Sequence, residues 1–78
     1  MVKRIISMNG ITDVTKMVTL AMVCDGDIII SSGRYAVDAK SILGIFSLDL
    51  SKPIELQIFS DDNAEIEKFM ADIAPFLA

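Results

Sequence analysis

The sequence contains no histidine and no tryptophan, and Cys24 is its only cysteine. Without histidine, the chain lacks the side chain that most readily gains and loses a proton near neutral pH. A single cysteine excludes a disulfide or a chelating cysteine pair within the chain and suits a reducing compartment. With no paired base and nucleophile either, we expect a protein that is not an enzyme and has no cofactor or metal site.

Long apolar runs and basic clusters are also missing. Charged residues interrupt every apolar segment well before the roughly 18 residues that a membrane helix needs. Lys3 and Arg4 precede an apolar stretch, but Asn9 and Gly10 break it too early for a secretory signal. The net charge is −4, and no basic stripe is present to neutralise nucleic-acid phosphates. We therefore expect a cytoplasmic protein that binds neither nucleic acid nor membrane.

Apolar side chains are abundant: 53% of the 78 residues are hydrophobic. A chain of this length buries only about 60% of its unfolded surface, so a stable core must be rich in such residues. There is room for one domain, which we assign to residues 1–78.

The first half of the chain predicts a strand, a helix and a hairpin. Residues 2–8 read as a strand that ends at the Asn9-Gly10 turn. Helical spacing then relates five apolar residues, which predict one buried helix face: Val14, Met17, Val18, Ala21 and Met22. Thr12 or Asp13 is expected to cap this helix. The β-branched run in 27–31 and the segment 34–37 predict a hairpin around Ser32-Gly33.

The second half predicts a short helix, a strand and a final helix. The short helix spans about 41–48, with Ser41 in position to cap it. Apolar residues alternate with polar ones over 54–58, which indicates a strand with one wet face. Asp62 and Glu65 form a capping-box-like start for the last helix, and Pro75 is expected to end it near Ile73.

The predicted order β-α-β-β-α-β-α favours an α+β open-faced sandwich, in which three helices cover one face of a four-stranded antiparallel sheet. A ferredoxin-like or ACT-type regulatory domain fits the pattern nearly as well. Ile28 or Ile30 is expected in the core, together with Val18, Met22, Leu56, Ile58, Ile66, Phe69 and Met70. Cys24 is expected to be a small buried hydrophobe. The Asp25-Gly26-Asp27 segment is expected to be a turn, because it lacks the further oxygen ligands of a calcium loop.

One segment carries a family resemblance. Residues 37–48, VDAKSILGIFSL, closely resemble the region around the regulatory serine of HPr phosphocarrier proteins from Gram-positive bacteria. They also resemble Crh, the paralogue of that family that acts in catabolite repression and lacks the active-site histidine. Asn9-Gly10-Ile11 is similar to the turn that precedes the phosphorylated histidine in the family. The resemblance implies the HPr-like open-faced β-sandwich.

The sequence departs from the family after that turn. The family continues with His, a short residue, Arg and Pro, whereas this chain has Thr12, Asp13, Val14 and Thr15. A phosphocarrier needs a nucleophilic imidazole, and a threonine phosphoester would be a poor relay. Asp13 would also repel a phosphate. The resemblance therefore implies a regulatory or interaction protein that does not relay phosphate and in which Thr12 takes the place of the histidine.

The resemblance also implies a site and partners. Ser41 becomes a candidate for phosphorylation by an HPr kinase, and the phosphorylated form would bind a carbon-catabolite regulator. Ile11, Ile42, Leu43 and Phe46 are the expected docking residues for protein partners. Ordinary core packing, or a patch for homo-oligomer formation, would explain the apolar residues equally well. The alternative function is a small-molecule-binding or dimerising regulatory domain unconnected with the phosphotransferase system.

Overall fold

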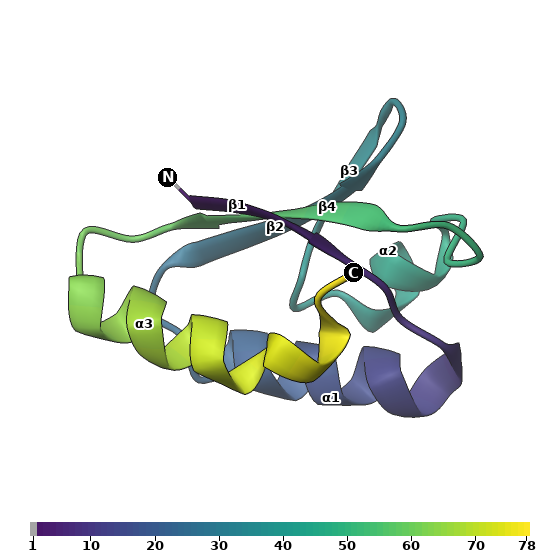
Figure 1. Ribbon diagram of the computed structural model, residues 1–78. Helices are drawn as coiled ribbons and strands as arrows, with labels where there is room; N and C mark the ends of the chain where they lie inside the picture. Colours follow the sequence, from purple (N-terminus) through teal and green to yellow (C-terminus); the bar gives the residue numbers. More distant parts are fainter. Residues whose placement is uncertain (1) are drawn as a thin grey trace.

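The fold is a four-stranded antiparallel sheet with helices on one face, as predicted (Figure 1). The structure is a computed structural model that describes residues 2–78. Its elements are β1 (Val2–Ile6), α1 (Gly10–Met22), β2 (Asp27–Ser32), β3 (Tyr35–Asp38), α2 (Ile42–Phe46), β4 (Ile54–Phe59) and α3 (Asn63–Asp72), followed by a 3-10 turn at Ala74–Phe76. The strand order is β1-β4-β2-β3.

Alternation of side chains along the strands places one face of the sheet in the core. Ile28 pairs with Ile58 and Ile30 pairs with Leu56 across the β2–β4 ladder, and all four side chains are buried. Ile29 and Gln57, which lie between them along the two strands, point to the opposite face because successive strand residues alternate. The remaining large core residues come mainly from the helices and strand ends: Ile6, Met8, Val14, Met17, Ile45, Phe69 and Ile73.

The start of α1 differs from the prediction. The helix begins at Gly10, whose φ is 77°, with Asn9 as the N-cap residue and no side-chain cap. Thr12 therefore lies within the first turn and does not cap the helix, so that prediction is wrong. Asp13 lies within α1 and does interact with the start of the helix. Its Oδ2 accepts a hydrogen bond from the backbone N–H of Asn9 at 2.8 Å.

The buried face of α1 is narrower than predicted. Val14, Met17 and Ala21 are buried and Val18 is partly buried, but Met22 is 66% exposed. At about 100° per residue, Met22 lies about 80° around the helix from Val14, at the margin of the stripe. It is also the last residue of the helix, so its prediction as a core residue is wrong.

The hairpin and the end of α3 agree with the prediction to within about a residue. Ser32 pairs with Tyr35, so Gly33 and Arg34 form the turn, and Gly33 supplies the positive φ of 59° that this turn requires. Helix α3 ends at Asp72, and Pro75 lies in the 3-10 turn that follows.

The residues after α3 return to β1. The Ser7 N–H donates to the Phe76 carbonyl at 2.7 Å, and the Ala78 N–H donates to the Ile5 carbonyl at 3.0 Å. Leu77 forms an antiparallel bridge with Ile6. The tail thus lies along the edge of β1 that faces away from β4.

Glu65 binds a neighbouring segment and does not complete a capping box. Asp62 is the N-cap residue of α3, and its carboxylate accepts hydrogen bonds from the N–H groups of Ala64 and Glu65, as predicted. The Glu65 carboxylate instead accepts from the Cys24 thiol at 2.9 Å and from the Gly26 N–H at 2.8 Å. Glu65 therefore ties the first turn of α3 to the connection between α1 and β2.

Over residues 2–78, no helix combines the length and the apolar character needed to cross a bilayer.

Candidate functional site

Ser41 caps α2, as predicted. Its backbone is extended, with φ −99° and ψ 101°, and its Oγ accepts a hydrogen bond from the Gly44 N–H at 3.1 Å. The Ser41 carbonyl accepts from the Ile45 N–H at 3.0 Å and so begins the helix. Because α2 has only five residues, a large share of its backbone bonds depends on this end.

Gly44 makes room for the capping hydroxyl. A Cβ at this position would lie 3.0 Å from the Ser41 Oγ and 3.2 Å from the Val37 Cβ on β3. The glycine thus lets α2 pack closely against β3 while Ser41 keeps its hydrogen bond. The hydroxyl of Ser47 at the other end of α2 donates to the Gly44 carbonyl.

The predicted docking residues on α2 are exposed. Leu43 is 82% exposed, Phe46 42% and Ile42 37%, whereas Ile45 between them is fully buried. One apolar residue anchors the short helix to the core, and three others remain on the surface beside an exposed Ser41. Leu43 is therefore not a core residue, whereas Ile42 and Phe46 bury more than half of their surface and expose the rest.

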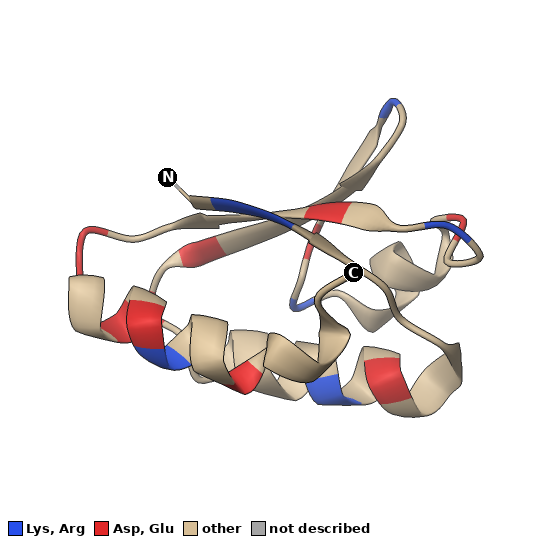
Figure 2. Cartoon of the chain, in the orientation of Figure 1, with Lys and Arg blue, Asp and Glu red and all other residues tan. Residues whose placement is uncertain are grey.

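The start of α1 supplies the rest of this surface. Helices α1 and α2 contact each other, and the first turn of α1 lies at the same end of the molecule as α2 (Figure 1). Ile11 is 65% exposed, and Thr12 beside it is also exposed. Figure 2 shows that α2 carries no charged residue, although acidic residues lie near it in the first turn of α1 and in the loop that follows α2, as well as around the start of α3. We call Ile11, Ile42, Leu43 and Phe46 the apolar surface.

The only perturbed thiol lies outside this surface. Burial of Cys24, reinforced by its hydrogen bond to Glu65, raises the pKa of the thiol. The same hydrogen bond and the one from Gly26 lower the pKa of Glu65. A thiol held in its protonated form is a poor nucleophile, which agrees with the prediction of Cys24 as a buried hydrophobe. The sequence pattern does not predict that Glu65 binds Cys24 and Gly26, because an acidic residue at this position fits a capping box equally well.

The arrangement of the sheet and helices defines the structural class of the protein. An antiparallel sheet that carries all its helices on one face is an open-faced α+β sandwich. Its candidate site presents one serine hydroxyl and an apolar surface suited to contact with another macromolecule.

Comparison with solved structures narrows the class. HPr from Thermoanaerobacter tengcongensis matches with a TM-score of 0.72 and 27% identity, covering 92% of this chain and 86% of that protein. The histidine-containing phosphocarrier protein from Mycoplasma matches with a TM-score of 0.67 and 17% identity, covering 99% of this chain and 98% of that protein. No protein-family model matches the sequence, and no curated protein matches it. The chain therefore has the HPr-like fold and is similar to these phosphocarrier proteins.

Proposed function

We propose that this HPr-like protein is a non-catalytic regulatory module that binds a protein partner through the apolar surface, with phosphorylation of Ser41 as its switch. The observation that carries the proposal is the exposure of Ile11, Ile42, Leu43 and Phe46 around two contacting helices, next to the Ser41 hydroxyl. Clustered exposed apolar side chains are typical of interaction sites in small proteins. The complete lack of histidine supports a role other than phosphate relay.

The position of Ser41 favours modification chemically. Its Oγ is exposed and already accepts the Gly44 N–H, so phosphate oxygens at the same place can accept that bond. A phosphate adds nearly two negative charges, which the N-terminal end of a helix stabilises. The modification would thus place a strong negative charge beside the apolar surface and change the partner that this surface prefers.

The partners we propose are an HPr kinase and a carbon-catabolite regulator, acting in the cytoplasm. Both follow from the similarity of residues 37–48 to the regulatory-serine region. Thr12, in the place of the family's histidine, then has no part in phosphate transfer, and Val14 in the place of the arginine extends the buried face of α1.

The test uses purified protein, an HPr kinase from a Gram-positive bacterium and a purified carbon-catabolite regulator. Kinase and ATP should add about 80 Da, one phosphoryl group, to the wild type and nothing to Ser41→Ala. The phosphorylated protein should bind the regulator, and Leu43→Ser should weaken that binding about tenfold without preventing phosphorylation. Val23→Ser is the matched control, because Val23 is apolar and 69% exposed at the other end of α1.

The result against the proposal is an unmodified Ser41 in a tube where ordinary HPr is phosphorylated. Equal binding by the Leu43→Ser and Val23→Ser proteins would likewise count against the apolar surface as the docking site.

A further inference from the structure

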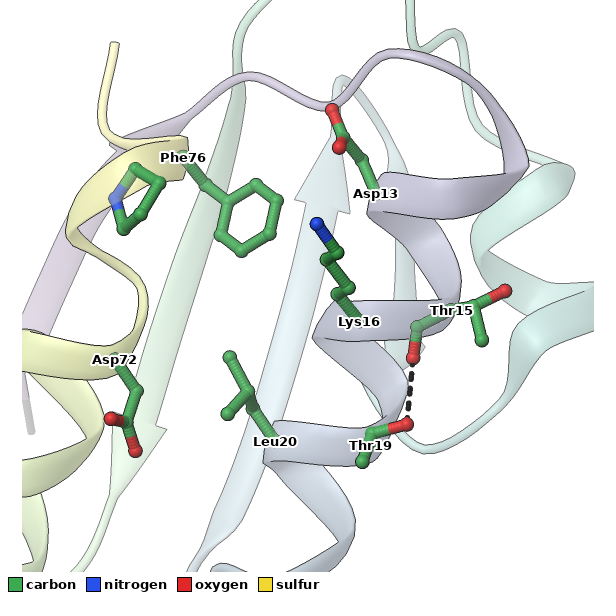
Figure 3. Close-up of a pocket in the computed structure, with 8 residues that line it drawn as sticks. Asp13, Thr15, Lys16, Thr19, Leu20, Asp72 and Phe76 are labelled. Atoms are coloured by element: carbon green, nitrogen blue, oxygen red, sulfur yellow. Dashed lines mark hydrogen bonds between the residues drawn. The ribbon is translucent and has the colours of Figure 1, made fainter.

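A second feature of the molecule is a hollow between α1 and the chain that follows α3. Its volume is about 430 Å³, within the range of roughly 300–1,000 Å³ that is typical of small-molecule sites. Leu20, Pro75 and the largely buried Phe76 form its apolar lining. Figure 3 shows Lys16 extending from α1 into the hollow between Asp13 and Phe76, with Asp72 on the facing end of α3.

The hydrogen-bonding groups of the hollow are unevenly divided between donors and acceptors. The hydroxyls of Thr15 and Thr19 donate to the carbonyls of Ile11 and Thr15, at 2.8 and 2.9 Å, so their protons are committed within the helix. Their oxygens keep lone pairs to accept with. The ammonium of Lys16 is therefore the main donor that the lining side chains offer to a ligand.

The acceptors outnumber that donor. One carboxylate oxygen of Asp13 accepts the Asn9 N–H, which leaves its second oxygen for another donor. Asp72 lies on the opposite wall and is exposed. Two carboxylates and one ammonium give the lining a net charge of −1, within a protein whose net charge is −4.

These groups define a ligand class. A simple anion would find one cation but two repelling carboxylates, and a simple cation would pair with a carboxylate but leave the Lys16 ammonium without an acceptor. A ligand that carries one carboxylate and one ammonium suits both walls of the hollow. Its carboxylate can pair with Lys16 on α1, and its ammonium can pair with Asp72 on α3. The apolar lining by Leu20 and Phe76 favours a hydrophobic substituent on the same molecule.

We infer that this hollow is a binding site for a zwitterionic amino acid with an apolar side chain. The site lies within a single chain, and its lining shares no residue with the apolar surface of α1 and α2. The inference therefore does not depend on the proposed function. Local sequence patterns do not reveal this hollow, because only the fold brings together the helices that carry Lys16 and Asp72.

The experiment is a titration of the ¹⁵N-labelled protein with L-phenylalanine, followed by amide chemical shifts. We expect shifts at Lys16, Leu20 and Asp72. Lys16→Met and Asp72→Asn should each weaken binding about tenfold, because each removes one charged hydrogen-bond partner. Lys52→Met and Asp61→Asn are the matched controls: they make the same changes at exposed positions outside the hollow and should bind like the wild type.

Three analogues test the ligand class directly. Phenethylamine lacks the carboxylate, 3-phenylpropanoate lacks the ammonium and glycine lacks the apolar side chain, so each should bind about tenfold more weakly than phenylalanine. Unchanged spectra at about 10 mM phenylalanine, tenfold above a millimolar Kd, would overturn the inference. So would shifts confined to residues outside the hollow, binding by Lys16→Met and Asp72→Asn that is as tight as that of the wild type, or an analogue that binds as tightly as phenylalanine.

Discussion

At the scale of single residues, Ser41 and Thr12 are both hydroxyl side chains near a helix start, yet only Ser41 caps its helix. Ser41→Ala should lower the free energy of unfolding by about 0.5–2 kcal/mol, because the Gly44 N–H loses its acceptor. Ser41→Asp should retain the wild-type stability, since a carboxylate also caps and suits the positive helix end. Urea unfolding of the purified variants measures both effects.

Thr12→Ala is the matched comparison. Thr12 is exposed within the first turn of α1, and alanine has the higher helix propensity, so we expect no loss and a gain of up to about 0.5 kcal/mol. Equal destabilisation by Thr12→Ala and Ser41→Ala would show that the two hydroxyls have the same role and would contradict this assignment.

The sequence could identify Ser41 as a cap because no other capping residue competes for the start of α2. Near α1 the prediction named two candidates, Thr12 and Asp13, and the helical stripe alone does not say which residue begins the helix. Gly10 decides it, since its positive φ turns the chain so that Asn9 becomes the N-cap. Backbone geometry of this kind is not contained in the pattern of apolar residues.

At the scale of the elements, the link between α3 and the α1–β2 connection depends on close packing at Gly26. A Cβ there would lie 2.5 Å from the Phe59 carbonyl oxygen and 2.8 Å from the Ser60 Cβ. Both atoms belong to the segment that leads into α3, so the segment would have to move. Gly26→Ala should therefore destabilise the protein by about 1–3 kcal/mol in thermal or urea unfolding. Asp25→Ala, at the exposed neighbouring position, is the control, and a stability loss as large as that of Gly26→Ala would contradict the packing argument.

The same link makes stability depend on pH through Glu65. Hydrogen bonds from Cys24 and Gly26 hold the pKa of Glu65 below its ordinary value. The resulting stabilisation is fully present above the pKa of the unfolded carboxyl, about 4.3, and is lost as the pH falls through the lower folded pKa. Glu65→Gln should be less stable than the wild type at neutral pH, and the difference should shrink below about pH 4.3.

Unfolding curves recorded between neutral pH and acid would show this convergence. Glu67→Gln removes an exposed carboxylate from the same helix and serves as the control. A stability difference between the wild type and Glu65→Gln that stays constant with pH would show that the Glu65 charge does not contribute.

Most elements could be predicted because local pattern and tertiary packing agree in them. The alternation of Leu56 and Ile58 with polar residues matches the buried face of the sheet. The helical spacing of the last helix matches a face on which Phe69 is buried and Ile66 and Met70 are partly buried. Met22 shows where the pattern fails: periodicity continues to the end of a helix, whereas burial ends where the facing sheet and helices end.

At the scale of the whole molecule, the protein should be inert in phosphate relay. The chain has no histidine, and Thr12 cannot form the labile phosphoramidate that passes phosphate onward. Incubation with enzyme I and labelled phosphoenolpyruvate should leave this protein unlabelled, while ordinary HPr in a parallel reaction takes up label. Stoichiometric label on any residue of this chain would contradict the prediction.

The candidate site was only partly accessible from sequence. The family resemblance identified Ser41, Leu43 and Phe46 as candidates. Whether the side chains of Leu43 and Phe46 are buried or exposed depends on how α2 packs against the sheet. Ile45 is the buried residue of this short helix, Ile42 and Phe46 remain partly exposed, and Leu43 is largely exposed. The hollow beside Lys16 depends on the approach of two helices distant in sequence, which no local pattern encodes.

The return of the chain to β1 has a consequence for solubility. An outer strand with free N–H and C=O groups is a template onto which another copy can add a strand, and such stacking is the first step toward fibrils. Here the carbonyl of Ile5 and the N–H of Ser7 are occupied by Ala78 and Phe76. The other outer strand, β3, offers only four residues. The covered end of β1 and the short β3 thus reduce the free strand edge onto which another copy of this protein, with its 53% hydrophobic residues, could pair.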